Sequence, residues 1–187
     1  MAFTSPRTWV SSEIVTAALM NTHVRDNERY LNGLDGDVTI NDDLILAEAK
    51  SLTFGDELLA TTDHTASGIK QAMVANEALV FGDLCYLNGS TKFAKADADV
   101  IGTTEGMLAL AIATIAQDAT GDMLLIGFAR DDTWNWTIGA DLYVDTTAGA
   151  ITETVPSGSG DQIRRVGYAV TADVMWFNPD GSILEVP

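Results

Sequence analysis

Residues 81–88 read FGDLCYLN, and residues 138–145 repeat their pattern as IGADLYVD. The two stretches share a glycine, a tyrosine and the flanking apolar positions, and each is typical of a short strand that runs into a turn. The first turn holds the dipeptide NG at residues 88–89, a strong hairpin signal, and the second holds TAG at residues 147–149. This echo predicts that two similar strand-and-turn units build one β domain.

The echo continues downstream. Residues 109–111 (ALA) and 167–169 (GYA) lie at nearly the same offset, and each precedes a further apolar strand, at residues 123–128 (MLLIGF) and 174–177 (VMWF). A duplicated β unit that closes on itself is the natural architecture for this pattern. We therefore predict a mainly β chain whose carboxyl-terminal part, residues 69–187, is a small β-barrel or sandwich with an internal duplication.

A helix is predicted near the amino terminus, from a cap at Thr16 to a stop at Asn32-Gly33. Its apolar residues follow the 4-3-4-3 spacing of a seam between identical helices. The predicted interface residues are Met20, Val24, Asn27, Leu31 and Leu34. A polar Asn27 inside the seam would fix its register and the number of helices. The alternative is a surface helix that docks on its own domain.

Between the helix and the β domain the apolar residues come in bursts of three, at residues 38–40, 44–46 and 52–54. Strands this short bury little, and their edges need hydrogen-bond partners, which copies of the same chain can supply. We therefore predict an amino-terminal arm and anchor helix over residues 1–36 and a short β shaft or connector over residues 37–68. The alternative is an ordinary meander at the edge of the β domain.

The charge of the chain excludes several partners. It carries 27 acidic and 10 basic side chains, for a formal net charge of -17. Beyond Lys95 the only cations are Arg130, Arg164 and Arg165, so no basic stripe is present to bind nucleic acid or anionic lipid. No apolar run approaches the roughly 20 residues that span a bilayer, and residues 4–7 lack the apolar character of a signal peptide. We expect assembly in a cytoplasm, without nucleic-acid or membrane partners.

No catalytic, metal-binding or cofactor-binding motif is apparent. The two histidines, His23 and His64, lie in no zinc spacing, and the single cysteine, Cys85, sits in an apolar strand pattern typical of a buried, inert thiol. The glycines of residues 158–160 lack the lysine and helix of a phosphate loop. Acidic residues 35–43 miss the calcium-loop pattern and are typical of solvated turns. We expect a protein that is not an enzyme.

Tryptophans give the one hint of a ligand. Trp134 and Trp136 flank Asn135, and in a strand this alternation places both indoles on one face, where they could stack against a sugar. The alternative is that they fill the core or a subunit interface. Trp176 and Phe177 point to opposite faces of their strand, so one of them needs a cover outside the sheet interior, which a neighbouring subunit would provide.

Motifs at both ends resemble those of tailed-bacteriophage virion proteins. The opening motifs, which are similar to the start of many tail-fibre and minor tail proteins, are PRTW (6–9), EIVTAA (13–18), MNTH (20–23) and RDN (25–27). Residues 127–134 (GFARDDTW) and 156–161 (PSGSGD) look like the terminal domain that accompanies such starts. The chain departs from the pattern at Leu19 and Glu28, where a polar residue and a leucine are more usual.

This resemblance implies a structural virion component that is commonly trimeric and attached through its amino terminus to other phage proteins. We therefore expect a non-enzymatic homotrimer in the tail, as a fibre or appendage. A weaker similarity to trimeric capsid decoration proteins keeps a decoration or head-fibre protein as an alternative. A module that binds host surface glycan is the second alternative, and an enzyme that degrades surface polysaccharide is a distant third.

Overall fold

The computed structural model describes residue 14, residues 16–21, residue 24 and residues 61–187. The described part near the amino terminus contains helix α1 (Ala17–Met20), which is capped as predicted because the Thr16 hydroxyl accepts a hydrogen bond from the Leu19 N–H at 3.3 Å. Met20 and Val24 of the predicted seam are exposed. Asn27, Leu31, Leu34 and residues 37–60 of the predicted shaft lie outside the described residues, so the seam and the shaft stay predictions.

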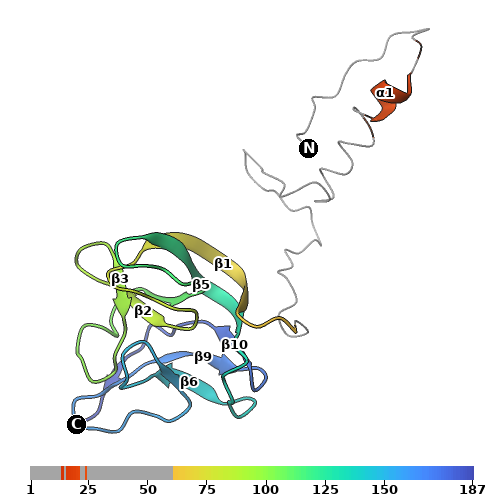
Figure 1. Ribbon diagram of the computed structural model, residues 1–187. Coiled ribbons are helices and arrows are strands. Elements are labelled where there is room, and N and C mark those ends of the chain that lie inside the picture. The colour runs from red at the N-terminus through yellow and green to blue at the C-terminus, as the bar shows by residue number, and fades with distance from the viewer. Residues whose placement is uncertain (1–13, 15, 22–23, 25–60) are drawn as a thin grey trace. The chain divides into compact units, whose positions relative to one another are not determined.

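Residues 61–187 are mainly β, which confirms the predicted class (Figure 1). The strands are β1 (Thr65–Val74), β2 (Leu84–Leu87), β3 (Phe93–Lys95), β4 (Leu108–Ala111), β5 (Thr120–Arg130), β6 (Asp141–Val144), β7 (Ile151–Thr152), β8 (Gln162–Ile163), β9 (Arg165–Ala169), β10 (Val174–Phe177) and β11 (Leu184–Glu185). Strand β1 crosses the predicted domain boundary at residue 69.

The strands β1 to β7, β9 and β10 form one antiparallel sheet, in the order β3-β2-β4-β5-β10-β9-β6-β7. Strand β5 is long enough to serve two neighbours: its first part pairs with β4, at Leu124 and Leu110, and its last part pairs with β10, at Phe128 and Trp176. Strand β1 pairs with β5 along its whole length. Strands β8 and β11 form a separate ribbon.

Two glycines lie where β5 changes partner. Gly68 of β1 pairs with Gly127 of β5, and both have a positive φ, of 141° and 149°. A Cβ atom on Gly127 would lie 2.1 Å from the Ser67 carbonyl oxygen, and one on Gly68 would lie 2.2 Å from that of Ile126. The two backbones approach so closely here that only glycine fits, and the register of β1 with β5 becomes irregular nearby, between Ile69 and Lys70.

The sheet curls into a half-barrel. Backbone hydrogen bonds connect segments near its two edges. The Leu84 N–H donates to the Gly149 carbonyl at 2.8 Å, and the Gly149 N–H donates to the Ala96 carbonyl at 2.7 Å. The Ala98 N–H donates to the Asp145 carbonyl at 2.9 Å. The turn after β6 is therefore tied to the start of β2 and to the chain that follows β3.

Two clusters of buried side chains lie on opposite faces of the first strands. The main core includes Leu84, Leu108, Leu110, Leu124, Leu142, Val144, Val166, Met175 and Phe177. The second core consists of Ala75, Leu79, Cys85, Phe93, Ala109, Ala111, Ile115 and Met123. Because side chains alternate along a strand, neighbouring residues of β2, β4 and β5 enter different cores. Cys85 is fully buried, as predicted.

The two echoed segments form β2 and β6, and their backbones match. Gly82 and Gly139 precede the strands with φ values of 88° and 83°. After the strands, the Asn88 side chain accepts a hydrogen bond from the N–H two residues on at 2.9 Å, and Asp145 does the same at 2.7 Å. The first turn is longer than a two-residue hairpin, since β3 begins only at Phe93.

The side chains of β2 and β6 do not all point to the faces that the repeat of residues 81–88 and 138–145 predicts. Tyr86 packs against the main core, whereas its counterpart Tyr143 does not. Leu84 and Leu142 both enter the main core, although the sequence repeat makes Leu142 the equivalent of Cys85 and not of Leu84. The backbones match at both ends of the two strands, whereas the inward-facing side chains are shifted by one residue, and β6 has a register irregularity between Leu142 and Tyr143.

Candidate functional site

The segment that carries both tryptophans is a loop, which corrects the prediction of a strand. The Trp134 N–H donates to the Asp131 carbonyl at 3.1 Å and the Trp136 N–H to that of Ala172 at 3.0 Å, so neither pairs in a sheet. The two indoles nevertheless stack on one another, with ring centroids 4.2 Å apart and planes 26° apart. Both are half-buried and pack against the main core.

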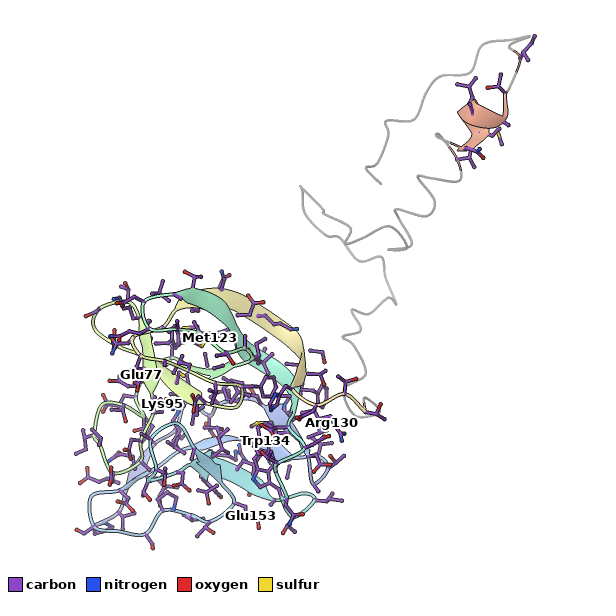
Figure 2. The ribbon with its side chains drawn as sticks, viewed as in Figure 1. Glu77, Lys95, Met123, Arg130, Trp134 and Glu153 are labelled. Carbon is purple, nitrogen blue, oxygen red and sulfur yellow. The ribbon has the colours of Figure 1, made fainter. Side chains whose placement is uncertain are left out.

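Trp134 also lines a cavity of about 350 Å³, whereas Trp136 does not reach it (Figure 2 labels Trp134). The loop before β2, the loop after β5 and the turn before β7 form its walls. Its lining residues are Phe81, Gly82, Asp83, Asp131, Thr133, Trp134, Ala148, Gly149, Ala150 and Ile151. This volume lies near the lower end of the range of small-molecule sites, roughly 300–1,000 Å³.

The carboxylates of the cavity are fixed by hydrogen bonds. Asp83 is buried, accepts a hydrogen bond from the Val80 N–H at 2.8 Å, and forms an ion pair with Lys95 at 3.1 Å. Asp131 is buried too, and its Oδ1 accepts hydrogen bonds from the backbone N–H and the hydroxyl of Thr133, at 2.8 and 2.6 Å. Rigid acceptors of this kind can bind hydroxyl groups without a further ordering cost.

An aromatic wall beside fixed carboxylates is a chemistry suited to sugars. Trp134 and Phe81 line the cavity, although one face of each ring is already covered, by Trp136 and by His64, and Asp83 and Asp131 supply acceptors for sugar hydroxyls. Asp83 is already neutralised by Lys95. The geometry thus supports binding, and it singles out no pair of carboxylates as a general acid and a nucleophile.

A second polar group adjoins the cavity and contains His64, which the sequence patterns gave no reason to single out. His64 Nε2 lies 3.6 Å from an Asp63 oxygen and 3.5 Å from an Asp131 oxygen, and its ring stacks on Phe81 with centroids 4.8 Å apart. Asp131 is 67 positions away from His64 in the sequence, so no local motif connects them. Only the pairing of β1 with β5 brings them together.

A third group lies beside β6 and β9, around Arg165. Its guanidinium bridges Asp141 and Asp180, each at 3.2 Å, and lies 4.7 Å from the centre of the Tyr168 ring. The pKa of Arg165 is raised, first by the hydrogen bond to Asp141. A shallow cavity of about 300 Å³ opens next to it, lined also by Tyr143. All charges of this group are paired, so we assign it a structural role.

Cys85 is no candidate nucleophile. Burial raises the pKa of its thiol far above the ordinary range, with the charge of Asp83 acting in the same direction. A thiol must lose its proton to act as a nucleophile, and here it stays protonated. Its Sγ lies 3.4 Å from the Asp83 carbonyl, within the second core.

Within the described part of the chain, no helix has both the length and the apolar character needed to cross a membrane. The predicted interface residues Met20 and Val24 lie in the amino-terminal part, whereas Trp134 and Trp136 lie together in the β unit. A comparison of the whole chain with protein-family models and with curated proteins found no match.

Proposed function

We propose that this chain is a structural protein of a tailed-bacteriophage virion, a homotrimer that serves as a tail fibre or tail appendage. The observation that carries the proposal is the set of opening motifs at residues 6–27, followed at the other end by a compact antiparallel β unit. The paucity of cations beyond Lys95 fits a partner that is protein rather than nucleic acid.

In this proposal the amino-terminal part anchors the trimer and the β unit is presented outward. The β unit would be an internally duplicated half-barrel. The support for a duplication is the strand order, in which β3-β2-β4-β5 and β7-β6-β9-β10 mirror one another, together with the matching glycines before β2 and β6. A decoration or head-fibre protein of the capsid is the alternative location for the same molecule.

Localisation in the particle tests the proposal. Gold-labelled antibody against the β unit should mark the tail of purified phage particles in electron micrographs, and light scattering should give three chains per molecule. Label on the capsid would favour the decoration alternative. Particles without the protein would overturn the proposal, and a monomer at micromolar concentration would overturn the trimer.

Removal of residues 1–36 tests the anchor. We expect the shortened protein to keep its β circular-dichroism spectrum and its melting transition, because, among the residues that the structure describes, both cores of the β unit are built from Ala66 onward. It should no longer assemble into particles. Incorporation at the level of the full chain would contradict the anchoring role.

Host-glycan binding is the second candidate function, and the cavity beside Trp134 favours it. We expect Trp134→Ala to weaken binding to host envelope polysaccharide at least about tenfold, since loss of an aromatic anchor costs about 2 kcal/mol. Trp134→Phe should keep most of the affinity. Trp176→Ala is the matched control, because Trp176 is also half-buried but lines no part of the cavity. Equal binding by all variants would exclude the cavity.

A further inference from the structure

Three metal-binding side chains meet where the chain enters and leaves the pair of long strands. Asp63 and His64 come directly before β1, and Asp131 comes directly after β5. Because β1 and β5 are antiparallel and Thr65 pairs with Arg130, the start of one strand lies beside the end of the other. Each of the three residues offers one ligand atom, and these atoms lie within 4.8 Å of one another; His64 Nε2 lies 3.6 Å from Asp63 Oδ2 and 3.5 Å from Asp131 Oδ2.

The two carboxylates divide their oxygens in the same way. Asp63 Oδ1 accepts hydrogen bonds from the backbone N–H groups of His64 and Asp132, at 2.9 and 2.8 Å. Asp131 Oδ1 accepts both hydrogen bonds from Thr133. In each case Oδ2 is left facing His64 Nε2. Metal-binding carboxylates are commonly held by such outer hydrogen bonds, which leave one oxygen for the cation.

Burial makes Asp131 the decisive member of the group. Its side chain is only 8% exposed, and within the described part of the chain its Oδ2 receives no hydrogen bond and has only the imidazole of His64 at 3.5 Å. This oxygen is not fully enclosed, since the buried side-chain atoms without a hydrogen-bond partner in the described residues are Thr104 Oγ1 and Arg130 Nε, and Asp131 lines the cavity. The side chain of Asp131 is therefore held in place by its Oδ1, and its Oδ2 is free to act as one ligand oxygen beside His64.

The surroundings keep the group negative and ordered. The pKa of Asp63 lies below its ordinary value, first because the Asp132 N–H donates to it, so this carboxylate is ionised at neutral pH. The nearby cation Arg130 is already engaged, by Asp132 at 2.7 Å and Asp173 at 3.5 Å. Stacking on Phe81 holds the imidazole of His64 in its orientation.

We propose that Asp63, His64 and Asp131 form a binding site for a divalent transition metal, of which zinc is the best fit. One imidazole nitrogen and two carboxylate oxygens are ligands that zinc accepts, whereas calcium and magnesium bind oxygen almost alone. Zinc ligands in a tetrahedron are about 3.3 Å apart, so the distances of 3.5 and 3.6 Å from His64 need little closure, and the two carboxylates, within 4.8 Å of each other, would move closer on binding. His64 and Asp63 are half-exposed, which leaves the fourth position to water.

A metal here would fasten residues 63–64, which lead into β1, to the end of β5. Because the three ligands come together only in the folded chain, the metal would bind the folded state alone and raise its melting temperature. Zinc binding at this site is independent of the virion role.

Titration calorimetry of the full chain with Zn²⁺ tests the site. We expect one zinc per chain, a melting temperature that rises with zinc concentration, and visible absorption from Co²⁺ in the same site. His64→Ala and Asp63→Asn should bind zinc at least about tenfold more weakly. Both residues are exposed, so these variants should fold, which circular dichroism will verify.

His23→Ala is the matched control, because His23 is the only other histidine of the chain and should leave zinc binding unchanged. Three results would overturn the proposal: a parent protein without saturable zinc binding, equal zinc affinity in His64→Ala, or magnesium binding as tight as zinc binding. The last would show that a highly acidic chain attracts any dication.

Discussion

The two halves of the β unit, β3-β2-β4-β5 and β7-β6-β9-β10, have the same strand order. They differ in how much of the outer face of the sheet is covered by other parts of the chain. In the first half, β4 is buried on both faces because the main core lies on one side and the second core on the other. In the second half, β9 has the main core on one side only, and Tyr168 on the other side is 37% exposed. The sequences of the two strands, LALA and RVGYA, reflect this difference.

The difference comes from the connections rather than from the strands. The outer face of the first half is covered by Ala75 and Leu79, which follow β1, and by Ile115, which lies in the long loop between β4 and β5. The corresponding loop between β9 and β10 spans only residues 170–173. Without a cover, the outer face of the second half keeps half-buried aromatic residues, such as Trp176 and Phe128, whose ring centroids lie 4.7 Å apart with their planes tilted by 56°. A second core therefore requires a segment long enough to cover it.

The largest expected effect is at the pair of Gly68 and Gly127, where β5 changes its neighbour from β4 of the first half to β10 of the second. Gly127→Ala should cost more than about 4 kcal/mol of unfolding free energy and leave the unit largely unfolded, because the new Cβ would lie 2.1 Å from backbone. The control is Gly89→Ala, since Gly89 has no neighbour within 4 Å and no positive φ. Urea unfolding measures both. A Gly127→Ala protein as stable as the control would show that the halves do not depend on this close approach of two backbones.

The next effect distinguishes the covered face from the uncovered face. Met123→Ala should cost about 3 kcal/mol, because Met123, which Figure 2 labels, has no exposed surface and belongs to the second core. Tyr168→Ala, on the uncovered face, should cost less than about 1 kcal/mol, mostly through its lost contact with Arg165. Urea unfolding at constant pH gives both values. Similar losses at the two positions would contradict the difference in cover.

A smaller effect tests the backbone match between the halves. Gly82→Ala and Gly139→Ala should each cost about 1–2 kcal/mol, because both residues have a positive φ. Valine should cost more stability at Gly82 than at Gly139. A Cβ on Gly82 already lies 3.5 Å from Trp134, whereas one on Gly139 has no neighbour within 4 Å. Thermal melts of the four variants give the comparison. If one alanine variant is harmless and the other severe, the two strand starts are not equivalent.

The sequence predicted the positions of the strands better than the orientation of their side chains. The apolar runs at residues 84–87, 108–111 and 174–177 are strands, because burial on at least one face demands such runs. The face that Tyr143 occupies was missed, since one residue of register decides it and the echo alone does not fix register. Periodicity likewise cannot tell the Trp134 loop from a strand.

The candidate sites also differ in whether the sequence could predict them. Trp134 was found because two tryptophans with one residue between them are conspicuous in any sequence. The group of Asp63, His64 and Asp131 was missed, because its members come from the two ends of a long-range strand pair. No spacing along the chain encodes that pairing, and only the fold reveals it.

The smallest expected effect compares one carboxylate from each half under acid. The pKa of Asp180, beside the second half, is lowered, first because the Ser182 N–H donates to it, and also by Arg165. Its contribution to stability is therefore present above the unfolded pKa of about 3.9 and lost as pH falls below that value.

The pKa of Asp97, in the first half, is raised, first by burial and also by Asp99. Protonation of Asp97 therefore favours the folded state as pH falls toward about 3.9.

These opposite signs give a test by melting temperature between pH 6 and pH 3. Asp180→Asn should lose less melting temperature on acidification than the parent protein, because the variant has no charge-dependent contact to lose. Asp97→Asn should lose more melting temperature than the parent protein. In the parent, protonation of Asp97 stabilises the folded state as pH falls and so offsets part of the loss, and the variant has no such group. Asp118→Asn is a control from an exposed surface pair with Lys92. Parallel curves for the Asp180 and Asp97 variants would show that the two environments do not differ in sign.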